Sequence, residues 1–169
     1  MITDAIPAPA LETLRRTFTA EITTVNRQGQ PITWPAVAYL DEASGRIVCA
    51  VSIAFPVKAH NARRHPQVSL LYSDRTGSGL DDQPAVLVQG TAEVAEVLEY
   101  PADVIGLFAT VARRQPDSER FTSNRVVRRF FSWYLFQRIA LRITPERVTV
   151  WPAGDFTARP ETFEVPRGG

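Results

Sequence analysis

The sequence is poor in the residues on which many catalytic and metal sites depend. It has one cysteine and two histidines, His60 and His65, so it can form no internal disulfide and shows no recognisable metal-ligand spacing. It also lacks a glycine-rich P-loop, a G-x-G-x-x-G dinucleotide fingerprint and a G-x-S-x-G nucleophile elbow. We therefore predict no metal site, and the sequence does not support an NTPase, a Rossmann dehydrogenase or a serine hydrolase.

The charge and hydrophobicity of the sequence limit the kinds of partner that we expect the protein to bind. The 19 Lys+Arg residues nearly balance the 18 Asp+Glu residues, and a net charge of +1 gives no bulk attraction to nucleic acid or to an anionic membrane. No stretch approaches the ~18 apolar residues of a membrane span, and the N-terminus does not resemble a secretion signal. With 169 residues, 44% of them hydrophobic, we expect one cytoplasmic domain that binds neither nucleic acid nor membrane.

Short β-rich runs separated by turn residues dominate the pattern. Strands are predicted over residues 20–26, 31–40, 46–53, 67–73, 84–97, 136–143 and 147–151, and helices over 9–18, 57–64, 101–114 and 122–134. Thr144-Pro145-Glu146 is predicted to be the turn of a closing hairpin, and Gly90 to mark a bulge or a close backbone approach. This pattern favours an α+β fold, a predominantly antiparallel barrel with flanking helices, followed by an irregular tail over residues 153–169.

The stretch FPVKAHNARRHP contains the only lysine of the chain, Lys58. A strand ending at Ser52 leads into a short helix, so backbone N–H groups and the positive helix end gather beside Ser52, Lys58 and Asn61. A compact ammonium group next to such donors suits a phosphate group. The alternative is a solvated basic helix face, with the lysine a matter of codon choice.

In order and spacing, this region resembles the FMN-binding split-barrel family, which includes relatives of pyridoxamine 5′-phosphate oxidase and the flavin/deazaflavin oxidoreductases. The resemblance rests on VSIAFPVKAHNARRHPQVSLLYSD, on AVLVQGTAEV and on the closing segment RIALRITPERVTVWP. Lys58, Asn61, Arg64 and Pro66 match the family pattern K-x-x-N-x-x-R-x-x-P approximately, with the proline one residue closer to the arginine unless Arg63 is the matching arginine. The resemblance covers roughly residues 20–94 and implies a six-stranded split β-barrel over residues 1–152 that forms a homodimer.

The resemblance also implies a set of cofactor-binding residues. Lys58 and Ser52 would hold the cofactor phosphate, Asn61 and Arg64 would support it, and the backbone from Val51 through Ile53 would face the ring. The remaining candidates are Thr33, Trp34 and Pro35 on the second strand, Gln89 from the partner's long strand, and Trp151 from the closing hairpin. Trp34 has packing as its alternative role. Many family members carry a further basic residue before the strand end, where this chain has Ala50 and Val51, so the phosphate site is expected to be built differently.

The function implied is that of a flavin-dependent oxidoreductase. FMN, or the deazaflavin coenzyme F-420, would bind at the dimer interface and pass hydride or electrons to a small-molecule substrate, which requires no catalytic acid, base or nucleophile from the protein. A non-enzymatic carrier of a flavin or a tetrapyrrole remains an alternative, as does an oxidase of a pyridoxal-type phosphate. The aromatic and basic run RVVRRFFSWYLFQR could bind single-stranded nucleic acid, but its helical spacing favours a packed helix or a dimer contact.

Overall fold

The computed structural model describes residues 1–53, 55–76, 78–95 and 138–166. In chain order its elements are α1 (Ile2–Ala5), α2 (Ala8–Arg16), β1 (Thr19–Val25), β2 (Pro31–Asp41), β3 (Arg46–Ser52), α3 (Val57–Arg64), β4 (Gln67–Tyr72), β5 (Ala85–Val94), β6 (Arg138–Trp151), a 3-10 turn η1 (Pro152–Gly154) and β7 (Glu161–Glu164). The opening helix, the first five strands and the helix after Pro56 agree with the predictions to within a few residues. The helices predicted over 101–114 and 122–134 lie outside the described residues.

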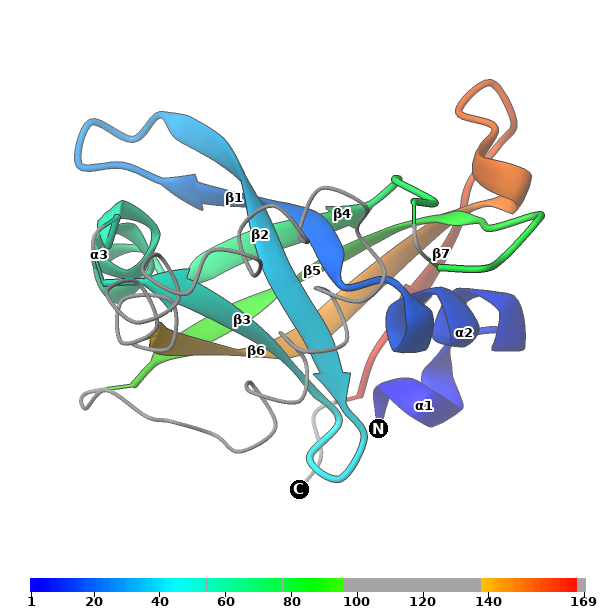
Figure 1. The fold of residues 1–169 in the computed structure, drawn as a ribbon, viewed down its shortest axis with the longest axis horizontal. Helices are drawn as coiled ribbons and strands as arrows, with labels where there is room; N and C mark the ends of the chain where they lie inside the picture. Colours follow the sequence, from blue (N-terminus) through cyan, green and yellow to red (C-terminus); the bar gives the residue numbers. More distant parts are fainter. Residues whose placement is uncertain (54, 77, 96–137, 167–169) are drawn as a thin grey trace, which may run out of the picture.

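Strands β1 to β6 form a closed antiparallel barrel (Figure 1). Neighbouring strands follow the order β3-β2-β1-β4-β5-β6, and β3 also pairs with β6, which closes the sheet on itself. Closure removes the unpaired edges that an open sheet would expose. The predicted α+β fold with a six-stranded antiparallel barrel is thereby confirmed.

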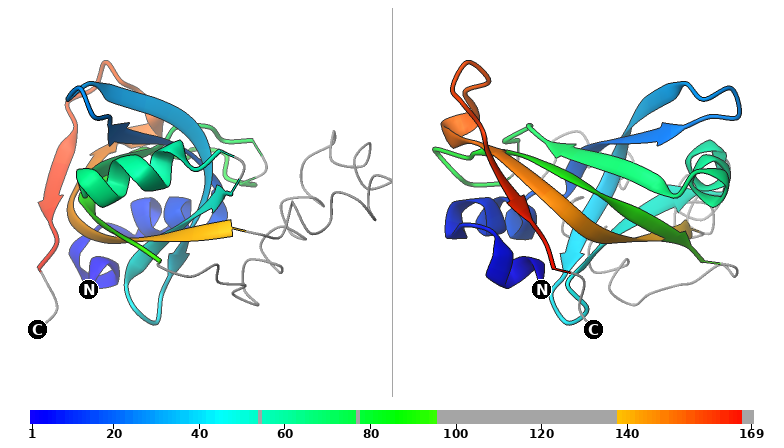
Figure 2. Two further views of the ribbon diagram at one scale, coloured as in Figure 1. Left: turned by 90° about the vertical axis from the view of Figure 1, so that its left-hand side faces the viewer. Right: turned by 180° about the vertical axis from the view of Figure 1, so that it is seen from behind.

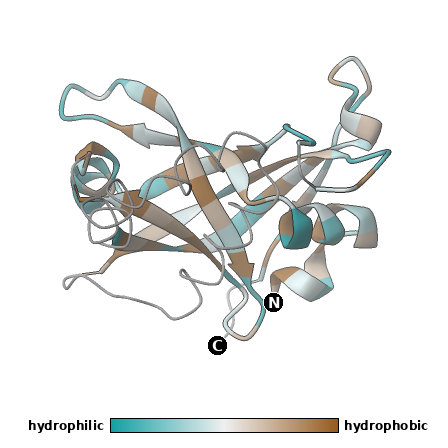
Figure 3. Cartoon of the chain, in the orientation of Figure 1, coloured by the Kyte–Doolittle hydropathy of each residue, from teal (hydrophilic) through white to brown (hydrophobic). Residues whose placement is uncertain are grey.

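Helices lie at both ends of the barrel (Figure 2). Helix α3 crosses one end and packs on β1 and β5, while α2 packs on β2 and β5 at the other end, beside α1. Between them the core is apolar because alternate residues of each strand point inward, as in β1, where buried and partly exposed residues alternate. Fully buried side chains include Ile22, Ile47, Leu70, Val86, Val88, Leu141 and Ile143. Hydropathy follows this arrangement, with hydrophobic residues along the strands and hydrophilic residues in the β1–β2 turn (Figure 3).

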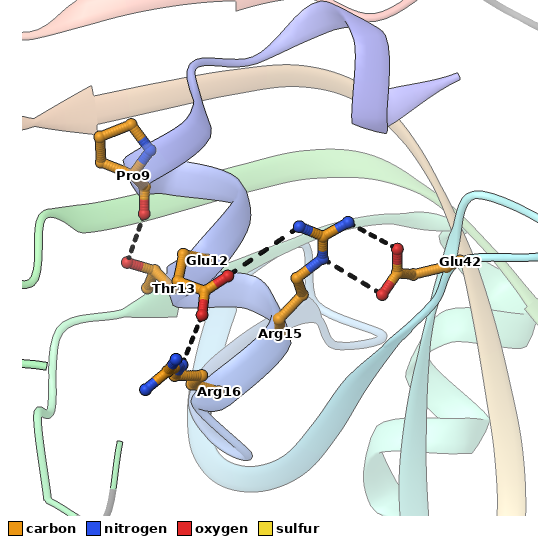
Figure 4. Close-up of polar contacts among 6 residues, drawn as sticks. All are labelled: Pro9, Glu12, Thr13, Arg15, Arg16 and Glu42. Atoms are coloured by element: carbon orange, nitrogen blue, oxygen red, sulfur yellow. Dashed lines mark hydrogen bonds and ion pairs between the residues drawn. The ribbon is translucent and has the colours of Figure 1, made fainter. Parts of the chain in front are cut away.

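Helix α2 is tied to the turn between β2 and β3 by a bidentate ion pair (Figure 4). Arg15 donates from Nε and Nη2 to the two carboxylate oxygens of Glu42, at 3.2 and 2.7 Å. Within the helix, the Thr13 hydroxyl donates to the Pro9 carbonyl at 3.2 Å. Because the ion pair is exposed, it contributes little to stability, and burial of Leu14 contributes more.

The predicted closing hairpin is wrong, because β6 runs without a turn from Arg138 to Trp151. Thr144 and Pro145 pair with Thr91 and Gly90 on β5, and the register shifts at Gly90 so that Glu146 is the extra residue. Proline has no backbone N–H to donate, and a bulge is one of the few places inside a sheet where that loss is tolerated. Pro145, which indicated a turn in the sequence, therefore lies at a bulge inside a long strand.

Gly90 lies in this bulge because a side chain would not fit there. A Cβ at position 90 would collide with the carbonyl oxygen of Thr144. The prediction of a bulge and a close backbone approach at Gly90 is confirmed. The bulge also separates two partners of one edge of β6, since its first half pairs with β3 and residues 147–150 pair with β7.

The tail predicted to be irregular over residues 153–169 contains a strand, so that prediction is wrong for Glu161–Glu164. These residues form β7, which pairs with β6, and Arg147 donates to Glu164 across the pair at 2.8 Å. The proline and glycine residues of the tail indicate irregular structure. The strand could not be predicted from them, because it forms by pairing with an edge of β6 that exists only in the folded barrel. None of the helices in the described part of the chain has the length and apolar composition of a membrane span.

We expect Gly90→Ala to lower the free energy of unfolding by ~3 kcal/mol, because backbone on both sides of the clash leaves little room to relax. Gly29→Ala is the matched control, since its Cβ would meet no atom and only its positive φ of +80° opposes the change, at a cost of ~1 kcal/mol. Urea unfolding followed by tryptophan fluorescence measures both. Equal stability of the two variants would contradict the close approach at Gly90.

Candidate functional site

A groove of about 520 Å³ opens at the α3 end of the barrel. It is formed by the middle of β2, the end of β3, the segment that enters α3, and the start of β6. Its lining consists of Thr19, Trp34, Pro35, Ala36, Val37, Ala50, Ser52, Phe55, Val57, Lys58 and Arg138. Most of these side chains are apolar, and the two charged residues among them, Lys58 and Arg138, are both cationic.

Strand pairing decides which side chains of β3 reach the groove. Ser52 pairs with Arg138, and Val51 pairs with Ile139. Residues directly opposite each other in an antiparallel pair share a face of the sheet, and successive residues alternate between faces. Val51 is buried in the barrel core, so Ser52 and Arg138 lie together on the opposite, groove-lining face.

Helix α3 holds Lys58 in its first turn. Pro56 occupies the N-cap position, and the turn before it is closed by the Phe55 N–H, which donates to the Ser52 carbonyl at 3.1 Å. The helix is anchored by Asn61, whose buried amide donates to the Thr24 hydroxyl of β1 at 3.1 Å. With this anchor in place, the half-buried Lys58 lines the same groove as Ser52.

Exposed apolar side chains border the groove. Trp34, Phe55 and Val57 are 46%, 69% and 50% exposed, and they are three of the five large hydrophobic residues that are exposed in the described parts of the chain. An isolated exposed apolar residue is ordinary, whereas several around one groove are typical of a binding site or an interface.

The structure brings together four of the eleven residues named as candidates from the sequence, namely Lys58, Ser52, Trp34 and Pro35. The others lie outside the lining. Val51 is in the core and Ile53 is partly buried next to Ser52; Asn61 anchors α3; Arg64 is exposed at the end of α3; Thr33 shares a hydroxyl hydrogen bond of 2.8 Å with Thr23; Gln89 is exposed on β5. The cofactor roles of all eleven stay predictions.

Trp151 is far from the groove of its own chain. It ends β6 and packs on Phe156 with ring centroids 5.4 Å apart, whereas Arg138 in the groove begins the same strand. Thirteen residue steps of extended strand span roughly 40 Å. Within one protomer Trp151 therefore cannot line the groove.

Sequence reasoning missed seven lining residues: Thr19, Ala36, Val37, Ala50, Phe55, Val57 and Arg138. Phe55 and Val57 flank the Lys58 segment, and two large apolar residues beside a turn were an available signal. Arg138 left no local signal, because only the pairing of β6 with β3 brings it to Ser52.

Two buried titratable groups, Cys49 and Tyr72, lie in the core of the barrel. Burial raises the pKa of the Cys49 thiol to about 12, and the nearby Lys58 ammonium opposes this shift only in part. Burial also raises the pKa of the Tyr72 phenol, whose hydroxyl makes no hydrogen bond within the described residues. Neither group is ionised near neutral pH, so Cys49 offers no thiolate nucleophile to the groove.

The sequence matches no family model and no curated protein, but solved structures are similar to it. A conserved hypothetical protein from Mycobacterium tuberculosis has a TM-score of 0.57 at 21% identity, over 98% of this chain and 95% of that one. An F420 reductase has a TM-score of 0.58 at 14% identity, over 85% and 98%. A protein from Clostridium acetobutylicum related to general stress protein 26, of the pyridoxinephosphate oxidase family, has a TM-score of 0.57 at 12% identity, over 92% of this chain and 91% of that one.

The chain is a split barrel. The fold implied by the resemblance to the FMN-binding split-barrel family is confirmed by these structures. Split barrels that are similar to this chain also include a FAD-binding protein from Mesorhizobium loti, with a TM-score of 0.52 at 14% identity over 84% of this chain and 89% of that one. A haem-binding protein from Mycobacterium smegmatis has 0.55 at 15% identity, over 94% of this chain and 59% of that one. The names of these proteins mention different ligands, so the ligand of this chain has to be inferred from the residues that line its groove.

We expect the Cys49 thiol of the folded protein to resist Ellman's reagent at pH 8 and to react fully once guanidinium unfolds the chain. Its pKa is about 12 when folded and ~8.5 when unfolded, so its contribution to stability is complete below ~8.5 and is lost as pH rises toward 12. Urea unfolding at pH 8 and pH 10 should therefore show a smaller alkaline loss for Cys49→Ala than for the wild type. Rapid labelling of the folded protein would show that the thiol is not buried.

Proposed function

We propose that this split barrel binds a flavin-type cofactor in the groove and acts as an oxidoreductase on a small molecule. The observation that carries the proposal is a mostly apolar groove whose lining also includes the ammonium of Lys58 and the hydroxyl of Ser52. A flavin mononucleotide has the same division, with a flat apolar ring and a phosphate group. The similar solved structures support a flavin-type ligand in general, because they include an F420 reductase and a FAD-binding protein.

Each part of the groove would have its own role toward such a cofactor. Lys58 would donate N–H bonds to the phosphate oxygens from a half-buried position, where charge-assisted bonds are stronger than at the surface. Ser52 would add one O–H donor. Trp34 and Phe55 would cover the apolar ring and exclude water from it. A bound flavin supplies the hydride or electron transfer, and the chain supplies binding, orientation and exclusion of water.

FMN is the first cofactor of the proposal, and the deazaflavin coenzyme F-420 is the second. An acidic tail, as on the deazaflavin, would need cations beyond the groove. Arg64 is exposed six residues after Lys58 on α3, roughly 9 Å along the helix. Arg63 is less suited, because it donates to the Ala95 carbonyl at 3.1 Å. This leaves a single described arginine on α3 for such a tail.

A carrier of haem or another tetrapyrrole is the alternative function, supported by the similar haem-binding protein. Haem iron in proteins is held by histidine, cysteine, methionine or tyrosine. None of the described residues that line the groove is of these types. The lining therefore favours a flavin over a haem.

The proposal includes a homodimer. Trp34, Phe55 and Val57 leave an apolar border around the groove that a second copy of the chain could cover. Gln89 and Trp151 lie away from the groove of their own protomer. In a homodimer they are candidates for the groove of the other protomer.

The first test is a titration of the purified protein with FMN and then with the deazaflavin, followed by the absorbance and fluorescence of the cofactor. Stoichiometric binding of either supports the cofactor site, and turnover of the bound cofactor by a nicotinamide donor separates an oxidoreductase from a carrier. Failure of both cofactors to bind at micromolar concentration would overturn the proposal. Binding of haem with a Soret shift would favour the carrier.

We expect Lys58→Met to weaken FMN binding by ~1–3 kcal/mol, about 5- to 150-fold in Kd, because it removes the ammonium and keeps the apolar stem. Arg27→Gln is the control, since it removes one positive charge from the exposed β1–β2 turn, outside the groove lining. Fluorescence quenching of FMN measures both affinities. An unchanged affinity in Lys58→Met would assign the lysine to the solvated helix face.

For the dimer, we expect Phe55→Glu to yield a monomer and Phe156→Glu to leave the dimer intact. Both phenylalanines are exposed, by 69% and 56%, but only Phe55 borders the groove. Light scattering coupled to size-exclusion chromatography gives the mass of each. A monomeric wild type, or a dimer in both variants, would count against this interface.

A further inference from the structure

The edge of β2 that faces β3 has no strand partner along part of its length. The β2–β3 ladder ends at the pair Val37–Ala50, although β2 begins at Pro31 and β3 continues to Ser52. Within the described residues, no strand pairs with this edge between Pro31 and Ala36. This stretch is the open edge of β2.

The open edge forms part of the groove. The lining includes the consecutive residues 34–37 of β2. Successive side chains of a strand point to opposite faces of the sheet, so a groove over one face would contact only every second residue. A groove that contacts consecutive residues therefore runs along the edge of the strand, where backbone N–H and C=O groups face it.

The hydrogen bonds between β1 and β2 determine which backbone groups face the open edge. The Ala38 N–H donates to the Phe18 carbonyl at 2.9 Å, so it points toward β1. The two strands pair one to one, and the N–H groups of an antiparallel strand alternate between its two edges. The odd-numbered residues of β2 therefore direct their N–H and C=O groups away from β1. Positions 31 and 35 are prolines, so Thr33 supplies the only N–H of the open edge.

Pro35 lies where the next bond of the β2–β3 ladder would form. The register that pairs Val37 with Ala50 would pair Pro35 with Ser52 if it continued by two residues. Pro35 has no N–H to donate to the Ser52 carbonyl, and that carbonyl accepts from the Phe55 N–H at 3.1 Å, in the turn that leads into α3. The ladder thus ends where β3 turns toward α3.

We propose that Pro35 is the residue that opens the groove. By ending the β2–β3 ladder before Ser52, it keeps the two strands apart where the chain enters α3. Pro31 has no such role, because the continued register places it opposite Pro56, which caps α3 and belongs to no strand. The prolines also deprive the open edge of the alternating donors that an added strand requires. The edge therefore stays available to small ligands of the groove and not to a further strand.

Hydrogen exchange of ¹⁵N-labelled variants, followed by NMR, tests this role. Pro35→Ala adds an N–H opposite the Ser52 carbonyl, whereas the matched control Pro31→Ala adds one at the same edge with no strand opposite. We expect the new amide at position 35 to exchange at least about tenfold more slowly than the new amide at position 31, each relative to its unstructured rate. Equal exchange of the two amides would show that the ladder does not extend, and would overturn the role of Pro35.

A second measurement on the same variants reports on the groove. Hydroxyl radicals modify exposed aromatic side chains, and mass spectrometry gives the rate at each residue. Extension of the ladder draws β2 toward the segment that enters α3, so modification of Trp34 and Phe55 should fall at least about twofold in Pro35→Ala. In Pro31→Ala neither rate should change. Phe156 is the internal control, because it is 56% exposed and lies outside the lining. Unchanged rates at Trp34 and Phe55 in Pro35→Ala would show that the proline does not open the groove.

The wild type tests the open edge without any substitution. The amides of Ile32 and Trp34 point to β1 and should exchange slowly, whereas the Thr33 amide points to the open edge and should exchange at least about tenfold faster. A slowly exchanging Thr33 amide would show that this edge is paired, and would overturn the proposal even if both variants failed to fold. None of these measurements uses a ligand, so their outcome is independent of the proposed function.

Discussion

The pairing of β3 with β6 is the interaction on which the rest of the structure depends. It closes a sheet that would otherwise end at two open edges, and it fixes the order in which six strands surround the core. The same register sets Ser52 beside Arg138 on the outer face while Val51 points inward. A slip of one residue would exchange these faces, so closure of the barrel and composition of the groove are one constraint.

Strand β6 meets this constraint by changing partners along its length. One edge pairs with β3 near the groove and with β7 beyond the bulge, while the other edge stays with β5. The bulge at Gly90 and Pro145 lies between these two regions. A bulge bends a strand and increases its twist, which allows one continuous strand to belong to the barrel at its start and to an outer pair at its end.

The sequence predicts the local parts of this structure well. Alternating apolar residues and turn signals indicate β1 to β5, and Pro56 marks the start of α3, because these features depend on neighbours in the chain. The predicted hairpin at Thr144-Pro145-Glu146 is wrong because the role of the proline depends on another strand. Pro145 pairs with Gly90 of β5, and this pairing leaves no signal among its neighbours in the chain. In the groove, Lys58 and Ser52 are close in sequence and were found, whereas Arg138 depends on a long-range register that no single segment encodes.

The position of the only lysine also gives the molecule an unusual chemical simplicity. Lys58 is the only lysine of the sequence, and it lines the groove. Chemistry directed at lysine side chains therefore has one target, and that target is in the groove. Acylation of that amine removes its charge, whereas reductive methylation keeps it. A single lysine thus makes bulk and charge in the groove separately adjustable on the intact protein, without any change of sequence.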